Sequence, residues 1–218
     1  MKKVSFKKML AIVAGALTLS SASLFAQEES APKITSDAGM DIYSSYIWRG
    51  AKFGTGAAFQ PSIKVTAGGL TVGSWNSISN GGVEAFESDL YATYAFDFGL
   101  GLTVTDYYFG GGAYFGDSVH FLEPSLSFNK SGFSFTGAYM FNCEDSYVEA
   151  GYAFPLITIS VGAGDGQYTI DGKFNLCNIT LKKTKTIAVT DKFSIPVTGG
   201  VTLNPSSENI YGYVGFTF

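Results

Sequence analysis

The sequence predicts an all-β fold: a single antiparallel transmembrane β-barrel of about twelve strands that follows a cleaved signal peptide. Three observations support this prediction. Apolar and polar residues alternate through most of the chain, short connections alternate with longer ones, and the last strand segment alternates up to the final residue. Ten strands is the alternative, because two of the segments are short. The predicted strands are 38–49, 57–67, 70–78, 84–97, 99–108, 118–129, 131–142, 146–154, 156–162, 173–185, 189–203 and 208–218.

The first 26 residues have the pattern of a secretory signal peptide. Four lysines precede an apolar run of about 11 residues, Met9–Leu19, and small residues follow up to Ala26. The run is shorter than the ~20 apolar residues of a transmembrane helix. We therefore expect cleavage after Ala22 or Ala26. Residues 27–37 would then form a short periplasmic segment, and 38–218 would form the barrel.

The mature chain is predicted to be acidic and to lack membrane-spanning helices. Without residues 1–26 it keeps 10 of the 14 basic residues and all 18 acidic ones, which gives a formal net charge of −8. This sign disfavours nucleic acid as a partner. After the signal peptide, no segment approaches 18 consecutive apolar residues, so strands would have to cross the membrane.

The carboxy-terminal segment gathers its apolar residues on one face. Ile210, Val214, Phe216 and Phe218 share one parity, whereas Tyr213 belongs to the more polar face. In a membrane barrel the first face meets lipid and the second lines the lumen. Such an aromatic ending also resembles the signal that outer-membrane proteins present to the barrel-insertion machinery. We therefore expect Tyr213, Val214, Phe216 and Phe218 to form that signal, outer-membrane lipids and the insertion machinery to be partners, and the location to be the outer membrane of a Gram-negative bacterium.

The connections between the predicted strands alternate in length. Bacterial barrels have short periplasmic turns and longer outer loops, whereas a β-sandwich has no reason to produce this rhythm. The short connections are Gly68-Gly69, Asp97–Gly99, Lys130–Gly132, Pro155 and a passage near Asp191. The longer ones are Gly50–Thr55, Ser79–Gly82, Gly110–Asp117, Asn142–Asp145, Gly162–Gly172 and Asn204–Ser207.

Two strand segments fit the alternation poorly. Asp106 has the parity of Val104, which would turn a carboxylate toward lipid at a high energetic cost. A β-bulge would redirect the strand, so we expect one there. Trp75 and Val72 have opposite parity, and a kink at Gly73 would account for this.

Seven polar residues are candidates for the lumen, because a charged side chain is costly against lipid. Arg49, the only arginine, has the parity of Asp41 and is expected near the outer end of the first strand. Acidic residues around it would form a constriction that favours cations. The alternative is a static network that fills the barrel and holds its strands together. The seven are Asp41, Arg49, Lys64, Glu87, Asp89, Glu123 and Glu149.

The predicted dimensions bear on function. Twelve strands ~4.8 Å apart with a tilt of ~40° give a backbone diameter of about 24 Å, and side chains reduce the passage to about 10 Å or less. The prediction is a narrow porin-like channel for ions or small polar solutes, not an enzyme. A non-conducting structural or adhesive barrel is the alternative. The sequence contains no motif for a cofactor or a metal.

His120, the only histidine, supports a third and remote alternative. Ser118 lies two residues earlier on the same face, and Ser–His pairs act in lipid-modifying enzymes on barrel surfaces. A lipid A hydrolase is therefore conceivable. Asp117 is near, but it has the wrong parity to orient the histidine. A polar residue beside an outer loop needs no catalytic role, and no catalytic residue is assigned.

Two further features are interpreted as structural. Cys143 in a predicted loop and Cys177 in a predicted strand are separated by two strands, so we expect two free thiols. The cluster 182–185, Lys-Lys-Thr-Lys, lies toward the inner end of its strand, where lysines anchor a barrel at the membrane boundary. A docking site for a periplasmic partner is the alternative.

Several short strings resemble a known family. Ser44–Gly50 reads S-S-Y-I-W-R-G, and echoes follow at Phe59–Ser62, Val104–Phe109 and Asp191–Val197, with a shared final Phe218. These strings are similar to those of the TorF-like outer-membrane proteins and related uncharacterised barrels of gut bacteria. The resemblance is scattered over most of the mature chain. It implies an outer-membrane β-barrel, and it implies no substrate and no catalytic residues.

Overall fold

The computed structural model describes residues 32–81, 85–116 and 119–218, and in these residues the chain forms one closed antiparallel barrel of twelve strands. The predicted all-β barrel and the number twelve are confirmed. The predicted signal peptide, residues 1–26, lies outside the described residues. The barrel strands are β1 (Ile34–Tyr43), β4 (Thr55–Ala67), β5 (Leu70–Asn80), β6 (Phe86–Ala95), β7 (Leu100–Tyr108), β8 (His120–Lys130), β9 (Phe133–Met140), β10 (Asp145–Ala153), β11 (Thr158–Gly164), β12 (Asn175–Thr190), β13 (Phe193–Asn204) and β14 (Asn209–Thr217).

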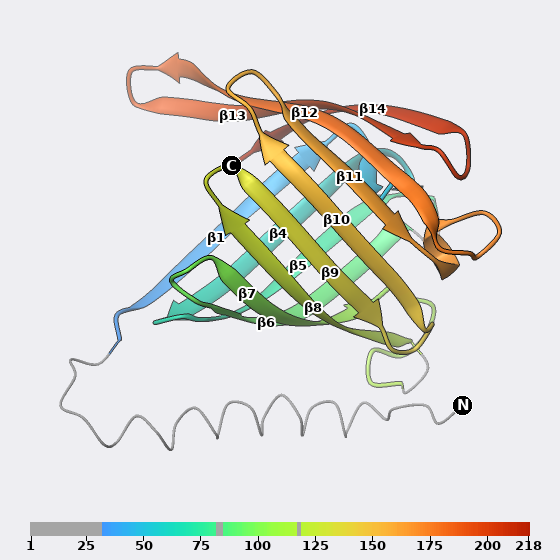
Figure 1. The fold of residues 1–218 in the computed structure, drawn as a ribbon. Helices are drawn as coiled ribbons and strands as arrows, with labels where there is room; N and C mark the ends of the chain where they lie inside the picture. The colour runs from blue at the N-terminus through green and yellow to red at the C-terminus, as the bar shows by residue number, and fades with distance from the viewer. Residues whose placement is uncertain (1–31, 82–84, 117–118) are drawn as a thin grey trace.

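Each strand pairs with its neighbours in the sequence, and β1 closes the ring against β14 (Figure 1). The short connections all lie at one end of the barrel, here called the turn end, and the longer ones at the other, the loop end. The β12–β13 hairpin extends past its neighbours at the turn end, because β12 pairs with β11 only as far as Lys182 but with β13 as far as Thr190.

The first predicted strand, 38–49, is wrong in its bounds. β1 begins at Ile34 and ends at Tyr43, and the following residues form a separate hairpin of β2 (Tyr46–Trp48) and β3 (Ala51–Phe53). The physical reason lies in its two-residue turn. Arg49 has φ +48° and Gly50 has φ +84°, and two positive φ values in succession give the type I′ turn that closes tight hairpins.

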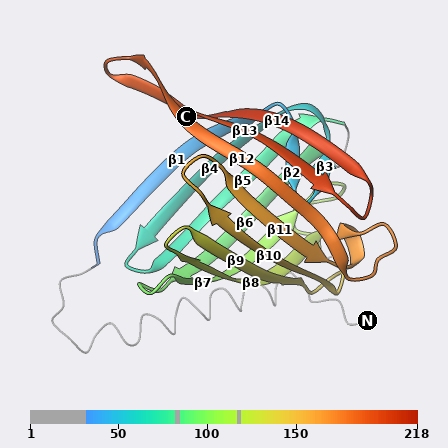
Figure 2. The same ribbon diagram turned by 45° about the horizontal axis from the view of Figure 1, so that its top comes forward.

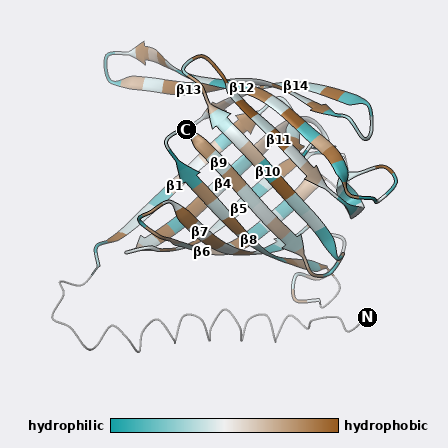
Figure 3. Ribbon diagram, in the orientation of Figure 1, coloured by the Kyte–Doolittle hydropathy of each residue, from teal (hydrophilic) through white to brown (hydrophobic). Residues whose placement is uncertain are grey.

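The wall of the barrel has an apolar outer face and a polar inner face, so hydropathy alternates along the strands (Figure 3). Ile210, Val214, Phe216 and Phe218 are exposed on the outer face of β14 and just beyond it, whereas Tyr213 points inward. The described residues contain no helix that is long and apolar enough to cross a membrane.

Tyrosines that point into the barrel lie over glycines of the adjacent strand. Tyr43 is paired in register with Gly215, and a Cβ added to Gly215 would lie 2.2 Å from the Tyr43 ring. Tyr213 is paired with Gly200 in the same way, with a separation of 2.4 Å. A methyl group has no room at either position, so the glycines let the rings lie flat against the wall and leave space in the lumen.

Replacing Gly200 by alanine is therefore expected to lower the free energy of unfolding by about 1–3 kcal/mol, because the new methyl group displaces the Tyr213 ring. Gly199→Ala is the matched control, since a Cβ at Gly199 meets nothing within 4 Å. Both changes remove the same backbone freedom from the unfolded chain. Urea unfolding of the refolded protein in lipid vesicles measures the difference. Equal stabilities for the two variants would contradict the packing described for Tyr213.

Candidate functional site

The β2–β3 hairpin folds into the lumen at the loop end and packs there against the inner wall (Figure 2). Its ring contacts reach several elements. The Tyr46 ring lies 5.5 Å from Trp75 of β5, and the Trp48 ring lies 5.8 Å from Tyr107 of β7. Trp48 also lies 5.8 Å from Tyr168, in the short 3₁₀ helix η2 (Gly166–Tyr168) between β11 and β12. Aromatic packing thus holds the hairpin against the wall at the loop end of the barrel.

Arg49 at the hairpin turn forms a bidentate ion pair with Glu123 of β8. The Nη1–Oε2 distance is 2.6 Å and the Nη2–Oε1 distance is 2.8 Å, and Arg49 Nη1 also donates to the Tyr168 hydroxyl at 2.7 Å. The guanidinium lies 4.4 Å from the Trp48 ring and 4.6 Å from the Tyr147 ring. With side chains 11% and 2% exposed, Arg49 and Glu123 form a desolvated pair between the hairpin and the wall.

Gly50 of the hairpin turn contacts another part of the wall, strands β12 and β13. Its carbonyl accepts a hydrogen bond from Asn204 Nδ2 of β13 at 3.2 Å. A Cβ at Gly50 would lie 1.9 Å from the Cys177 carbonyl oxygen of β12, so only glycine fits there. The hairpin starts between the neighbouring strands β1 and β4, and its turn touches β8, β12 and β13. It therefore crosses the lumen.

Two further carboxylates lie buried near the hairpin. Glu87 and Asp89 of β6 are 4% and 5% exposed and share the inward face of the strand. Together with Glu123 they give three buried acids around a single arginine. Among the described residues, the Oδ1 atom of Asp89 is a buried side-chain oxygen without a hydrogen-bond partner. One carboxyl oxygen of this cluster thus lacks the hydrogen bond that a buried polar atom needs.

Replacing Asp89 by asparagine is expected to raise the free energy of unfolding by about 1 kcal/mol. The amide cannot ionise, and it supplies a donor toward the neighbouring carboxyl group of Glu87. Glu87→Gln should act in the same direction, and the double variant should gain less than the sum, because either change relieves the same repulsion. Thermal unfolding of the three variants in one detergent measures these effects. A loss of stability in Asp89→Asn would show that the carboxylate is needed as an acceptor.

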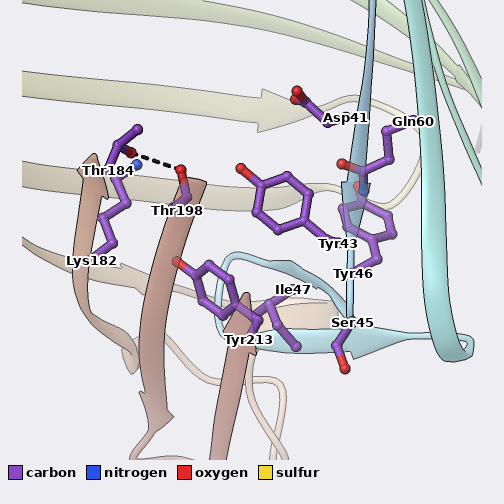
Figure 4. A pocket seen from close by; sticks show the side chains of 10 residues that line it. All are labelled: Asp41, Tyr43, Ser45, Tyr46, Ile47, Gln60, Lys182, Thr184, Thr198 and Tyr213. Carbon is purple, nitrogen blue, oxygen red and sulfur yellow. Dashed lines mark hydrogen bonds between the residues drawn. The ribbon is translucent and has the colours of Figure 1, made fainter. Parts of the chain in front are cut away.

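Below the hairpin, toward the turn end, the lumen contains a polar chamber (Figure 4). One cavity of about 340 Å³ lies against β1, β12, β13 and β14, and a second of about 370 Å³ extends along β9–β12 to Arg49. Ile47, Lys182 and Tyr213 line both cavities, so the two are adjacent. The first is lined by Asp41, Tyr43, Ser45, Tyr46, Ile47, Gln60, Lys182, Thr184, Thr198 and Tyr213.

The structure separates the sequence-predicted lumen residues into two groups. Arg49, Glu123, Glu87 and Asp89 lie in the buried layer at the hairpin. The other three lie closer to water: Asp41 lines the first cavity, Glu149 lines the second, and Lys64 forms an exposed ion pair of 3.2 Å with Asp37 near the turn end.

The prediction of Arg49 on the first barrel strand was wrong, because Arg49 belongs to the hairpin turn rather than to the wall. Sequence reasoning also missed Lys182, which it grouped with its neighbours at the membrane boundary. The signal was present: Lys182 shares its parity with Thr180 and Thr184, which face the lumen, whereas Lys183 has the opposite parity.

Asp106 faces outward without the predicted bulge, because β7 keeps its register with both neighbours. Its partner is His120 of β8, whose Nδ1 lies 2.9 Å from Asp106 Oδ2. The His120 Nε2 contacts the backbone carbonyl of Tyr114, so the connection after β7 covers the pair. The Asp106 side chain is 14% exposed and the His120 side chain is 1% exposed, so the carboxylate is shielded from lipid.

The described contacts of His120 tie a loop to the wall. The predicted pair of Ser118 and His120 stays a prediction, because Ser118 lies outside the described residues. The absence of enzyme activity stays a prediction.

The chain matches no protein-family model and no curated protein sequence. Function is therefore argued from the geometry of the lumen. Among the described residues, no group of three or more His, Cys, Asp or Glu side chains is arranged to hold a metal ion.

Proposed function

We propose that this protein is an outer-membrane β-barrel that acts as a narrow channel for ions and small polar solutes, with the β2–β3 hairpin as its constriction. The apolar outer face and polar lumen of the closed barrel support a membrane location. The long connections would face the cell exterior and the short turns the periplasm. Lipids of the outer membrane and the barrel-insertion machinery would then be its partners.

The observation that carries the proposal is the polar chamber beneath the hairpin. Its two cavities contain carboxylates, a lysine, hydroxyls and amides, and these groups can replace part of the water shell of a permeating solute. Within the chamber, the carboxylates of Asp41 and Glu149 outnumber the ammonium of Lys182, because the charge of Arg49 is paired with Glu123. An excess of carboxylates over cations along the lumen favours the passage of cations.

Planar-bilayer recording of the refolded full chain tests this function. We expect small, discrete conductance steps and a reversal potential that indicates cation preference in a KCl gradient. Glu149→Gln should weaken this preference, because Glu149 is one of the two carboxylates that line the chamber. Lys185→Gln is the control, since Lys185 has outward parity on β12.

Electrically silent protein whose heat-modifiable gel mobility shows a folded barrel would overturn the channel. It would favour a second candidate, a non-conducting barrel that displays its loops. The anchoring of the hairpin to β8 and β13, through the Arg49–Glu123 and Gly50–Asn204 contacts, is the observation that supports this second function.

A further inference from the structure

Two opposite charges line the first cavity. The carboxylate of Asp41 extends from β1, and the ammonium of Lys182 extends from β12, on different sides of the space (Figure 4). Neither side chain forms a hydrogen bond or an ion pair with another described residue, whereas Arg49 and Glu123 in the buried layer at the hairpin are paired with each other. Both charges are thus available to a solute that enters from the turn end.

A row of hydroxyl groups lies between the two charges. Tyr43, Gly215, Thr198 and Thr184 are successive register partners across four strands. Thr198 and Thr184 share a hydrogen bond of 2.7 Å. The Tyr43 ring occupies the space that a side chain at Gly215 would fill. Hydroxyl groups both donate and accept, so this row can contact the amide or the backbone of a solute whose ends carry charge.

We propose that this chamber binds small zwitterions of the amino-acid and short-peptide class, with the solute carboxylate at Lys182 and its ammonium at Asp41. The proposal deepens the channel function and rests on it, because it names what the lumen selects. A dianion would bring one negative group to Asp41, a dication would bring one positive group to Lys182, and a neutral sugar would leave both charges uncompensated. The cavity of about 340 Å³ is of a size that suits a small molecule.

The second cavity also places a lysine and a carboxylate along the lumen. Lys182 lines both cavities, and Glu149 lies on the hairpin side of the second. Glu149 accepts hydrogen bonds from Tyr147 at 2.7 Å and Asn178 at 2.6 Å, which hold its carboxylate in place. A zwitterion can therefore keep its carboxylate near Lys182 while its ammonium passes from Asp41 to Glu149, which gives a stepwise route toward the hairpin.

Calorimetric titration of the full chain in lipid nanodiscs tests the proposal without measuring current. The probe is glycylglycine, compared with N-acetyl-glycylglycine, which lacks the ammonium, and glycylglycine amide, which lacks the carboxylate. We expect each blocked form to bind roughly tenfold more weakly than glycylglycine. The Asp41→Asn variant should bind N-acetyl-glycylglycine as tightly as glycylglycine, and it should still bind glycylglycine amide more weakly. In Lys182→Gln the pattern should reverse, and Lys185→Gln should behave as the wild type.

Equal affinity for the three probes, or no binding by any of them, would overturn the proposal even if the protein conducts ions. Binding with the expected pattern by a protein that is silent in bilayers would uphold the site and overturn the channel. The two failures are thus distinguishable, because binding and conductance are measured separately.

Discussion

Replacing Arg49 by methionine is expected to lower the free energy of unfolding by about 3–5 kcal/mol. Arg49 makes both short contacts to Glu123, a side chain that is 2% exposed. Without the guanidinium, the Glu123 carboxylate keeps, among the described residues, the hydrogen bond from the Tyr107 hydroxyl at 3.1 Å. An uncompensated buried charge then opposes folding. Urea unfolding in lipid vesicles measures the loss.

The double variant Arg49→Met with Glu123→Leu is the control for this explanation. Removing both charges should recover most of the lost stability, because a buried pair contributes little beyond well-packed apolar side chains. Arg49→Lys should be intermediate, since an ammonium supplies the charge but not the bidentate geometry. A double variant as unstable as Arg49→Met would mean that the stacking of the guanidinium on Trp48 and Tyr147, and not charge compensation, holds the hairpin.

Replacing Tyr46–Phe53 by a short glycine–serine linker is expected to raise single-channel conductance by roughly threefold or more, because the hairpin occupies the cross-section of the lumen. The wall should survive this change. β1 and β4 pair directly from Ile34↔Ala67 to Tyr43↔Ala58, without any contribution from the hairpin. Freed from the hairpin, Glu123 would meet water instead of protein. Recording in planar bilayers measures the change.

The control for the excision shortens the β12–β13 hairpin by removing residues 186–194, which extend past the neighbouring strands at the turn end. Its conductance should equal that of the wild type, because this segment lies outside the lumen. An unchanged conductance after excision of Tyr46–Phe53 would place the narrowest point of the passage elsewhere.

The barrel wall could be predicted from the sequence because residues close together in the chain determine which face of a strand each side chain occupies. Parity alone places Asp41, Glu123 and Glu149 inward, since a period of two residues assigns each side chain to lipid or lumen. Strand number followed from the regular rhythm of turns and loops, which a closed barrel requires at its two ends.

The hairpin could not be predicted in the same way. Tyr46, Ile47 and Trp48 alternate like any strand, so periodicity does not reveal whether the chain continues up the wall or turns back into the lumen. The pair Arg49-Gly50 was the available turn signal. Asp106 illustrates a second limit, because its partner His120 lies 14 residues away and becomes visible only through the register of β7 and β8.

The central claim is that the hairpin narrows the loop end of a chamber that is open at the turn end. Thiol accessibility tests it most directly, with Thr184→Cys as the reporter in the chamber and Cys143→Ser as the background. In a parallel sample without the Cys143→Ser change, the native Cys143, exposed at the loop end, verifies delivery of the reagent to that side. Burial and then Asp145 raise the pKa of its thiol, so labelling is done above neutral pH.

Labelling of Thr184→Cys by a membrane-impermeant maleimide, in oriented proteoliposomes, should be at least roughly tenfold faster from the turn end than from the loop end. Excision of Tyr46–Phe53 should make the two rates similar. Equal rates in the protein with its hairpin intact would contradict the account.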